Sequence, residues 1–223
     1  SFVTAPDYEV KSEYTVDVTA SDGVNSTVQE TAVSVSNTND NSPVFTSSSS
    51  LSSLENQTAI GTLTASDLDG DSVTFSVAGS EFTITESGVL SFVTAPDYEV
   101  KSKYTVDVTA SDGTNNTTQM LTINITDAND NAPVFTSSSS LSALENQTAI
   151  GTVTASDLDG DSITFSVSGF EFAITEAGIL SFVTAPDYEV KSEYTVDVTA
   201  SDGVYSTVQE TAVIVTNTND NSP

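Results

Sequence analysis

The sequence predicts an all-β protein built from tandem seven-stranded β-sandwich domains with Greek-key connections. The first observation behind this prediction is a repeat with a spacing of 90 residues, marked by Pro43, Pro133 and Pro223. The second is the alternation of apolar and polar residues along short segments, which is typical of strands with one buried face. The third is that turn-forming Gly, Asn, Asp and Ser residues separate these segments, and no apolar pattern has a helical period.

The repeat divides the chain into three parts. Residues 43–132 and 133–223 are complete repeats that match almost position for position, whereas residues 1–42 match only the second half of a repeat. A unit of 90 residues can bury a modest core and fold alone. Two or three strands without a facing sheet are marginal in water. We therefore expect residues 1–42 to be disordered, or to be ordered only by borrowing strands from another copy.

The first three expected strands of a complete repeat lie on either side of an acidic turn. Residues 44–54 begin with Val-Phe-Thr and continue with serines, which predicts a short, irregular strand. Residues 60–66 are rich in β-forming side chains and end at the acidic turn 67–71. Residues 73–77 alternate apolar and polar side chains, so one face of this strand is expected to be buried.

The remaining four strands complete the expected sandwich. Residues 82–85 and 89–93 are separated by a Ser-Gly turn and predict a hairpin. Residues 104–110 and 121–125 both alternate apolar and polar side chains over a longer span. Each complete repeat is therefore expected to contain seven strands and no helix.

The charge of the chain excludes two classes of partner. It carries 32 acidic residues, four lysines and no arginine, which gives a formal net charge of -28. Nucleic acids and anionic membranes are bound through basic patches, so we expect neither as a partner. Cations are the natural partners, although a salt-adapted surface would also be acidic. No apolar run approaches about 18 residues and no signal-peptide pattern opens the chain, so we expect an excerpt of a longer protein without direct membrane insertion.

The missing residue types narrow the function further. The chain has no cysteine, which is unusual in small domains of secreted animal proteins and common in bacterial surface proteins. It has no histidine, which excludes Ser-His-Asp and Cys-His catalytic sites. Paired carboxylates could serve glycoside hydrolysis, but here they recur in every repeat, and the chain has no Arg or Trp. We therefore expect no enzymatic activity.

A polar linker joins consecutive repeats, and acidic residues stand at the strand ends beside it. Its clearest copy is Asp-Ala-Asn-Asp-Asn-Ala-Pro at 127–133, with variants at 37–43 and 217–223. In a seven-stranded antiparallel sandwich, the second and sixth strands end at the N-terminal pole, and the Asp-Tyr-Glu segment lies at the C-terminal pole. The middle linker is therefore expected to gather eight carboxylates. The polar residues expected at this joint are Glu55, Asp97, Glu99, Asp127, Asn129, Asp130, Asp157, Asp159 and Asp202.

These residues predict a calcium site. Asp97 and Glu99 are two residues apart, as are the aspartates of each Asp-Leu-Asp turn, so in extended chain both members point the same way. Without a cation, clustered carboxylates repel one another. Carboxylate, amide and carbonyl oxygens in a chain without His or Cys favour Ca²⁺ over zinc or copper. Asp71 and Asp161 either bind a further ion or only shape their turns.

The motifs resemble the calcium motifs of cadherin repeats. The linker at 127–133 is accompanied, in family order, by Leu-Glu-Asn at 54–56, Asp-Tyr-Glu at 97–99, Ala-Ser-Asp-Leu-Asp at 155–159 and Ala-Ser-Asp-Gly at 200–203. The resemblance covers both complete repeats. It implies a cadherin-like, Ig-like fold with calcium-binding linkers and up to about three Ca²⁺ ions per complete joint. The tandem array also resembles the extender region of long RTX-type bacterial adhesins.

The resemblance implies further ligands at each joint. Backbone carbonyls of Ala128 and Asn131 are expected to bind at the middle joint. The outer linkers have Asn37 and Asn217 in place of Asp127, so each offers one carboxylate fewer. The candidate ligands of the first joint are Asp7, Glu9, Asn37, Asn39, Asp40, Asn41, Asp67, Asp69 and Asp112. Those of the last joint are Glu145, Asp187, Glu189, Asn219 and Asp220.

The sequence thus predicts a calcium-rigidified extender segment that projects a distal binding domain of a bacterial adhesin away from the cell, either secreted or at the cell surface. Its expected partners are neighbouring repeats of the same chain, without an obligate oligomer, and the distal ligand lies outside this segment. The alternative is a calcium-dependent carbohydrate- or protein-binding module. Most aromatic side chains fall at core-facing positions, which leaves Tyr98, Tyr188 and Tyr205 as candidates for such a surface.

Overall fold

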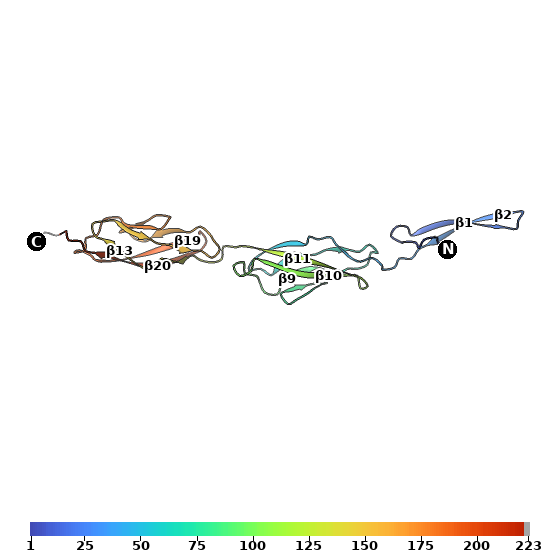
Figure 1. The fold of residues 1–223 in the computed structure, drawn as a ribbon, viewed down its shortest axis with the longest axis horizontal. Coiled ribbons are helices and arrows are strands. Elements are labelled where there is room, and N and C mark those ends of the chain that lie inside the picture. Colours follow the sequence, from blue (N-terminus) through green and yellow to red (C-terminus); the bar gives the residue numbers. More distant parts are fainter. Residues whose placement is uncertain (221–223) are drawn as a thin grey trace. The chain divides into compact units, whose positions relative to one another are not determined.

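The computed structural model describes residues 1–220 and divides into two compact units, Ser1–Thr126 and Asp127–Pro223 (Figure 1). Every regular element in the described range is a β-strand, which confirms the all-β fold class. The end of the last linker motif, residues 221–223, lies outside the described residues. Within residues 1–220 there is no helix with the length and apolar character needed to cross a membrane.

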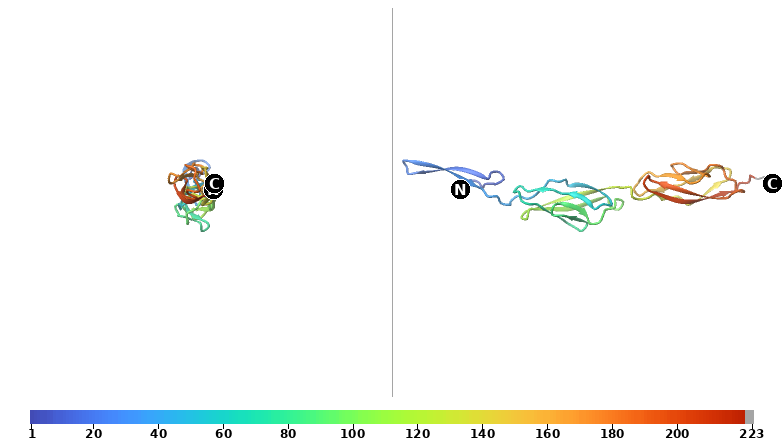
Figure 2. Two further views of the ribbon diagram at one scale, coloured as in Figure 1. Left: turned by 90° about the vertical axis from the view of Figure 1, so that its left-hand side faces the viewer. Right: turned by 180° about the vertical axis from the view of Figure 1, so that it is seen from behind.

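One sheet of the first unit has four strands. Its order is β4 (Ser50–Leu54), β11 (Asn116–Thr126), β10 (Lys103–Ser111) and β7 (Thr74–Val77). Strands β10 and β11 pair antiparallel over nine residues, from Lys103 opposite Asn124 to Ser111 opposite Asn116. The two strands form the long central ladder of the unit, and they run lengthwise between its two ends (Figure 2).

The opposite sheet is built from shorter strands. A three-stranded sheet has the order β5 (Ala59–Thr62), β9 (Val89–Phe92) and β8 (Phe82–Ile84). Strands β3 (Val44–Phe45) and β6 (Ala65–Ser66) pair antiparallel beside it. The predicted hairpin over 82–93 is present, because β8 and β9 pair antiparallel.

The predicted first strand is broken into β3 and β4, which belong to different sheets. The backbone amide of Thr46 still donates to the carbonyl of Thr64, at 2.8 Å, whereas the carbonyl of Ser49 accepts from Thr122, at 2.9 Å. The serines between these contacts carry the chain from one sheet to the other. Strand β4 then pairs parallel with β11, so the pairing is not purely antiparallel as expected. The parallel pair joins the first and last strands of the repeat.

The second unit repeats this arrangement. Its sheets have the strand orders β13-β20-β19-β16, β14-β18-β17 and β12-β15. The strands are β12 (Val134–Phe135), β13 (Ser140–Leu144), β14 (Ala149–Thr152), β15 (Ala155–Ser156), β16 (Thr164–Val167), β17 (Phe172–Ile174), β18 (Ile179–Phe182), β19 (Glu193–Ser201) and β20 (Ser206–Thr216).

The core of each complete repeat lies between the two sheets. In the first unit, Leu90 from one sheet and Val108 and Leu121 from the other are completely buried. In the second unit, Leu180, Val198 and related side chains form the same cluster. These residues occupy the inward positions of the predicted alternation, so burial of one face explains the pattern.

Residues 1–42 contain a two-stranded hairpin, whereas we expected disorder or order only through strands borrowed from another copy. Strands β1 (Glu13–Ser21) and β2 (Ser26–Ser34) pair antiparallel along their full length. Val16 and Val18 remain 50% and 53% exposed, because no second sheet covers this face of the hairpin in the described residues. Local hydrogen bonding therefore forms the hairpin without the core that its apolar side chains normally join.

Gly178 tests the packing at the β17–β18 turn. It adopts a φ of 82°, and a Cβ atom there would collide with the Val153 carbonyl and lie 3.3 Å from the Phe165 ring. Gly178→Ala should lower the free energy of unfolding of the second unit by ~1–2 kcal/mol for the left-handed backbone and by a further ~1–3 kcal/mol for the clash. Scanning calorimetry will measure the loss.

Gly169→Ala is the matched control, because Gly169 has a φ of 89° but open space around its Cβ position. This variant should show only the backbone contribution. Equal losses for the two variants would contradict the packing described for Gly178.

Candidate metal centre

The first linker is held against the repeat that follows it by one carboxylate. The backbone amides of Asp40 and Asn41 donate to Oδ2 of Asp69, at 3.0 and 2.8 Å. The side-chain amide of Asn41 donates to Oδ1 of Asp69 at 2.8 Å and to Oδ1 of Asp40 at 3.0 Å. Both oxygens of Asp69 thus accept hydrogen bonds from the linker, and the Asn41 amide lies between two carboxylates.

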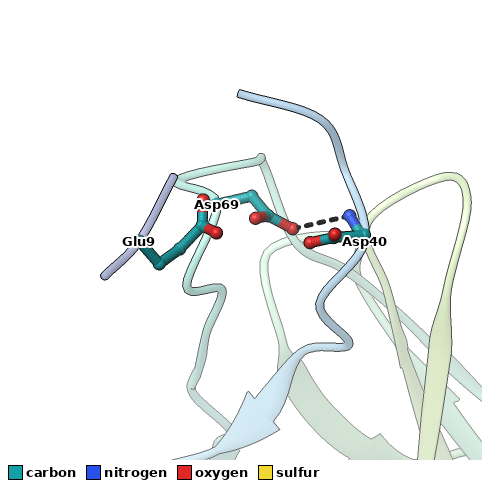
Figure 3. Close-up of side chains that lie close together, drawn as sticks. All are labelled: Glu9, Asp40 and Asp69. Atoms are coloured by element: carbon teal, nitrogen blue, oxygen red, sulfur yellow. Dashed lines mark hydrogen bonds between the residues drawn. The ribbon is translucent and has the colours of Figure 1, made fainter. Parts of the chain in front are cut away.

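Three carboxylates converge at this linker. One oxygen each of Glu9, Asp40 and Asp69 lie within 4.8 Å of one another (Figure 3). Glu9 comes from the segment before the hairpin, Asp40 from the linker and Asp69 from the turn after β6. The first linker therefore brings together acidic side chains from before, within and after it. The Asp7 carboxylate caps the turn that presents Glu9, because it accepts from the Glu9 and Val10 amides.

Asp67 and Asp69 lie in a turn, so the prediction that an extended backbone aligns them is wrong. Oδ1 of Asp67 accepts from the Asp69 amide at 2.9 Å and from the Asp71 amide at 3.4 Å. This turn still brings the carboxylates of Asp67, Asp69 and Asp71 within 4.8 Å of one another. An aspartate turn closes on its own backbone amides, and this local bonding competes with an extended chain.

The Ser-Asp-Gly turn after β10 contributes two polar groups to the first linker. Oδ1 of Asp112 accepts from the amides of Thr114 and Asn115 at 2.7 and 2.6 Å. The Asn115 side chain donates to Oδ1 of Asn39 at 2.8 Å and to the Asn41 carbonyl at 3.0 Å. The sequence reasoning missed Asn115. Its position two residues after Ser-Asp-Gly was the available signal, but the second repeat has a tyrosine there.

The C-terminal pole of the first complete repeat carries a buried acid. Glu55 is 1% exposed, and its Oε2 accepts from the Tyr98 amide at 2.7 Å. One oxygen each of Glu55, Asp97 and Glu99 lie within 4.8 Å of one another. Asp97 caps a turn by accepting from the Val100 amide, so this pair also converges through a turn and not through an extended strand.

At the N-terminal pole of the second unit, Asp159 accepts hydrogen bonds from the linker in the same way as Asp69 does in the first unit. Asp159 accepts from the amides of Asp130 and Asn131 at 3.0 and 2.9 Å, and from the Asn131 side chain at 2.7 Å. Oδ1 of Asp157 accepts from the Asp159 amide at 3.1 Å. The Asp127 side chain is exposed at the start of this unit, and Ala128 and Asn129 are half-buried. In both units, therefore, an aspartate of the repeat accepts hydrogen bonds from the backbone amides of the linker that precedes it.

The C-terminal pole of the second unit is organised around Glu145, which is 2% exposed. Its oxygens accept from the amides of Thr218 and Tyr188 at 2.5 and 2.9 Å. The carboxylates of Glu145, Asp187 and Glu189 also come within 4.8 Å. A buried acid thus ties the strand end at this pole both to the Asp-Tyr-Glu turn and to the segment that follows β20.

The asparagines that replace Asp127 in the outer linkers act as donors. The Asn37 amide donates to the Asp69 carbonyl at 2.8 Å, and the Asn217 amide donates to Oε1 of Glu189 at 2.9 Å. At the last linker, Asp220 accepts from the Asn146 side chain at 2.6 Å, and Asn219 is exposed. These linkers therefore use amide hydrogens where the middle linker carries a carboxylate.

The surroundings of the carboxylates shift their pKa values in opposite directions. Burial raises the pKa of Glu9, and the neighbouring Asp69 and Asp7 carboxylates raise it further. Burial acts in the same way on Asp69, but the hydrogen bonds donated by Asn41 and Asp40 outweigh it and hold its pKa below the usual range. Asp69 is thus stabilised as an anion, whereas burial and the two neighbouring carboxylates disfavour the anion of Glu9.

Comparison with known proteins identifies the fold family. The sequence profile of the family described as "Bacterial Ig domain" matches residues 39–126 and 129–215. The chain belongs to this Ig-domain family. The two matched ranges correspond to the complete repeats. The β1–β2 hairpin lies before residue 39, where the first match begins.

Cadherins are among the relatives of these Ig domains. "Cadherin EGF LAG seven-pass G-type receptor 1" of Mus musculus is 33% identical over 217 residues, which cover 86% of this chain and 7% of the receptor. Cadherin-23 of Rattus norvegicus is 34% identical over 181 residues, which cover 72% of this chain and 5% of that protein. The chain therefore spans less than a tenth of these relatives.

Solved structures show the same fold. The mouse clustered protocadherin PcdhgC3 EC1-3 has a TM-score of 0.76 and 24% identity, and the match covers 95% of this chain and 80% of that one. Protocadherin gammaB7 EC3-6 has a TM-score of 0.75 and 20% identity, covering 96% of this chain and 60% of that one. These similarities confirm the cadherin-like β-sandwich fold.

The polar groups of the Ig domains fit a hard divalent cation. The atoms that converge at the poles are carboxylate oxygens, which are ligands that Ca²⁺ prefers. Each complete repeat contains buried carboxylate oxygens that accept no hydrogen bond from the described residues, among them Oδ2 of Asp67, Asp112, Asp157 and Asp202. A buried oxygen of this kind requires a partner that the protein does not supply.

Glu145 predicts a pH dependence of the second Ig domain in chelator. Hydrogen bonds from the Thr218 and Tyr188 amides hold its pKa below the usual range. The resulting stability is present above the unfolded-state pKa of about 4.3 and is lost as the pH falls through the lower folded-state value. Glu145→Gln should therefore flatten the fall of the unfolding temperature below about pH 4.3. Identical slopes for the variant and the parent chain in calorimetry would contradict this assignment.

Proposed function

We propose that the chain is a calcium-stiffened extender segment of a bacterial surface adhesin. The observation that carries the proposal is the convergence of Glu9, Asp40 and Asp69 at the first linker, within 4.8 Å. An extender segment needs rigid connections between its domains. Three like charges around a linker repel one another and oppose this rigidity until a cation neutralises them. Calcium would supply that neutralisation.

Hydrogen bonds within the chain already fix one side of the linker. Asp69 accepts from two linker amides, which fixes the linker to the following repeat without an ion. Glu9 makes no comparable backbone connection to the linker, and burial, followed by the neighbouring Asp69 and Asp7 carboxylates, raises its pKa. The ion is therefore expected to tie the preceding segment, through Glu9, to the linker that Asp69 already holds.

The same proposal extends to the other linkers through their sequence. Each linker carries the Asn-Asp-Asn core followed by Ser-Pro or Ala-Pro. Each complete repeat carries the buried Glu and three Asp-containing turns. We expect up to about three Ca²⁺ ions at a complete joint, with neighbouring repeats of the same chain as partners. The candidate ligands are those given for the three joints above.

The cellular setting is part of the proposal. The family description, the absence of cysteine and the near-identity of the repeats favour a bacterial protein outside the cell. Extracellular calcium reaches millimolar levels, which suits modules with a Kd of roughly 0.1–1 mM. The distal ligand would be bound elsewhere in a longer protein, and no catalytic role, nucleic-acid partner or obligate oligomer is proposed for this segment.

Asp69→Asn tests the calcium site. Titration calorimetry of the full chain should show fewer bound Ca²⁺ ions for this variant, because it loses a converging carboxylate while an amide retains part of the linker bonding. Calcium at about 100 times its Kd stabilises a folded domain by ~2.7 kcal/mol, so the calcium-induced rise in unfolding temperature should also shrink.

Asp107→Asn is the matched control, because Asp107 is an exposed strand residue of the same repeat and loses the same charge. It should leave both the number of bound ions and the thermal shift unchanged. Equal effects of the two variants would show that the chain responds only to its net charge.

Stiffening is tested separately by small-angle scattering. The maximum dimension of the chain should be larger and better defined in millimolar calcium than in chelator, because neutralised linkers resist bending. The same distance distribution under both conditions, with calorimetry showing bound calcium, would contradict the extender role while leaving the metal sites in place.

One observation favours a second candidate function, a ligand-binding module. Phe170 is 98% exposed, so the expectation that only Tyr98, Tyr188 and Tyr205 could offer an aromatic surface is wrong. Phe170 borders a surface cavity of about 330 Å³ that also includes Glu171, Phe182, Val183, Thr184, Ala185, Pro186, Asp187, Val190 and Tyr194. An exposed ring beside carboxylates can stack on a sugar and accept hydrogen bonds from its hydroxyls.

Phe170→Ser discriminates the two functions. Ser80 occupies the equivalent position in the first repeat and lines the equivalent cavity, so the substitution copies a natural neighbour. We expect the parent chain to bind no sugar on a glycan array, with or without calcium. Sugar binding that Phe170→Ser abolishes would favour the binding module over the extender.

A further inference from the structure

The linkers before the two complete repeats differ in how the Ser-Asp-Gly turn contacts them. At the first linker, the Asn115 side-chain amide donates to Oδ1 of Asn39 at 2.8 Å and to the Asn41 carbonyl at 3.0 Å. The second repeat has Tyr205 at the equivalent position, and a tyrosine side chain has no amide group to donate. Two oxygens of the first linker are therefore bonded to a group that the second repeat lacks.

The backbone of the turn is the same in both repeats. Oδ1 of Asp112 accepts from the Asn115 backbone amide at 2.6 Å, and Oδ1 of Asp202 accepts from the Tyr205 backbone amide at 2.7 Å. In each turn the aspartate amide also donates to the carbonyl three residues later, at 3.3 Å. Position 205 is thus held by the same backbone bonds as position 115, and what differs there is the side chain.

The lack of a donor in the second repeat leaves an acceptor of its linker unbonded. Oδ1 of Asn129, the counterpart of Asn39, is buried and accepts no hydrogen bond from the described residues. Buried polar atoms nearly always have a partner, and side-chain carbonyl oxygens of asparagine are ligands of Ca²⁺. A cation can therefore supply at Asn129 the contact that Asn115 supplies at Asn39.

We propose that the residue at position 115 or 205 sets how strongly the adjoining linker depends on calcium. Asn115 bonds two linker oxygens with its own amide group, so the first linker is held in part without metal. Tyr205 leaves the equivalent oxygens, Oδ1 of Asn129 and the Asn131 carbonyl, to the cation. This role rests on the calcium function proposed above and adds a residue that regulates the same site.

Asn115 and a cation compete for the same oxygens. The Asn115 nitrogen lies 2.8 and 3.0 Å from its two acceptors, so it occupies a position from which one atom contacts both. An ion that uses both oxygens must displace the amide group or share them with it, and either lowers the affinity of the linker for the ion. The amide group has no net charge, so it bonds these oxygens without neutralising the carboxylates of the linker.

Tyr205→Asn tests the role of this position at the middle linker, because complete repeats precede and follow that linker. The full chain is titrated with calcium, and amide hydrogen exchange is measured by mass spectrometry in peptides spanning residues 34–42 and 124–132, which differ in sequence. The new amide can bond Asn129, so exchange across 124–132 in chelator should be slower than in the parent chain. The calcium concentration at half-protection should rise roughly tenfold, as is typical of changes beside metal ligands.

Tyr205→Phe is the matched control, since it changes the same side chain without adding an amide donor. Tyr205 is 43% exposed, so neither substitution removes a core side chain. Tyr205→Phe should leave both the exchange in chelator and the half-protection concentration as in the parent chain. Asn115→Tyr is the reciprocal variant at the first linker. It should speed exchange across 34–42 in chelator, because Asn39 loses its donor.

The outcomes separate the role of position 205 from the calcium function. A half-protection concentration in Tyr205→Asn that is equal to or below that of the parent chain would overturn this role while leaving the calcium function in place. Equal effects of Tyr205→Asn and Tyr205→Phe would also overturn it, because loss of the tyrosine alone would then explain the change. If calcium protects no linker of the parent chain, both proposals are wrong.

Discussion

The hydrogen bonds between an aspartate turn and the linker backbone determine what each joint can do. Asp69 and Asp159 each accept from two consecutive linker amides, so the linker is fixed by its own main chain. Main-chain donors require no particular side chain of the linker, but they require an acceptor in one position, and the carboxylates of Asp69 and Asp159 supply it. The linker therefore acquires a fixed negative charge beside its own aspartates, and the electrostatics of the joint follow from this constraint.

The sandwich places a buried acidic residue at the opposite pole of each complete repeat. Glu55 and Glu145 are almost completely buried, and both accept amide hydrogen bonds from the Asp-Tyr-Glu turn. The amide donors replace the hydrogen bonds to water that these side chains lose on burial. Each repeat thus has an apolar centre between two acidic ends, and the charge is concentrated where repeats are joined.

The sequence predicted most of the strands and the grouping of the acids at the poles. Alternation of apolar and polar residues determines which face is buried, and strand direction determines which ends share a pole. The crossing of the first strand between sheets was not predictable, because serines have no strong preference for either path. The turns of Asp67 and Asp97 were misread as extended, since side-chain-to-backbone bonding outweighed strand propensity there.

Individual contacts were harder to predict than the overall pattern. Asn115 bonds to the linker through a side chain whose role depends on the exact path of a turn. The exposure of Phe170 depends on a loop that has serine in the neighbouring repeat. The hairpin of residues 1–42 formed because long antiparallel pairing is local, whereas burial of its valines needs residues distant in sequence.

The parallel pairing of β4 with β11 has a mechanical consequence. These strands are the first long strand and the last strand of the repeat, and five residue pairs join them, from Ser50 with Thr122 to Leu54 with Thr126. A pull on the two ends of the repeat loads these pairs along the strand direction. All five must then slide together, whereas strands peeled from one end would separate pair by pair. Resistance to tension is therefore concentrated in the five backbone pairs between β4 and β11, which end at Thr126.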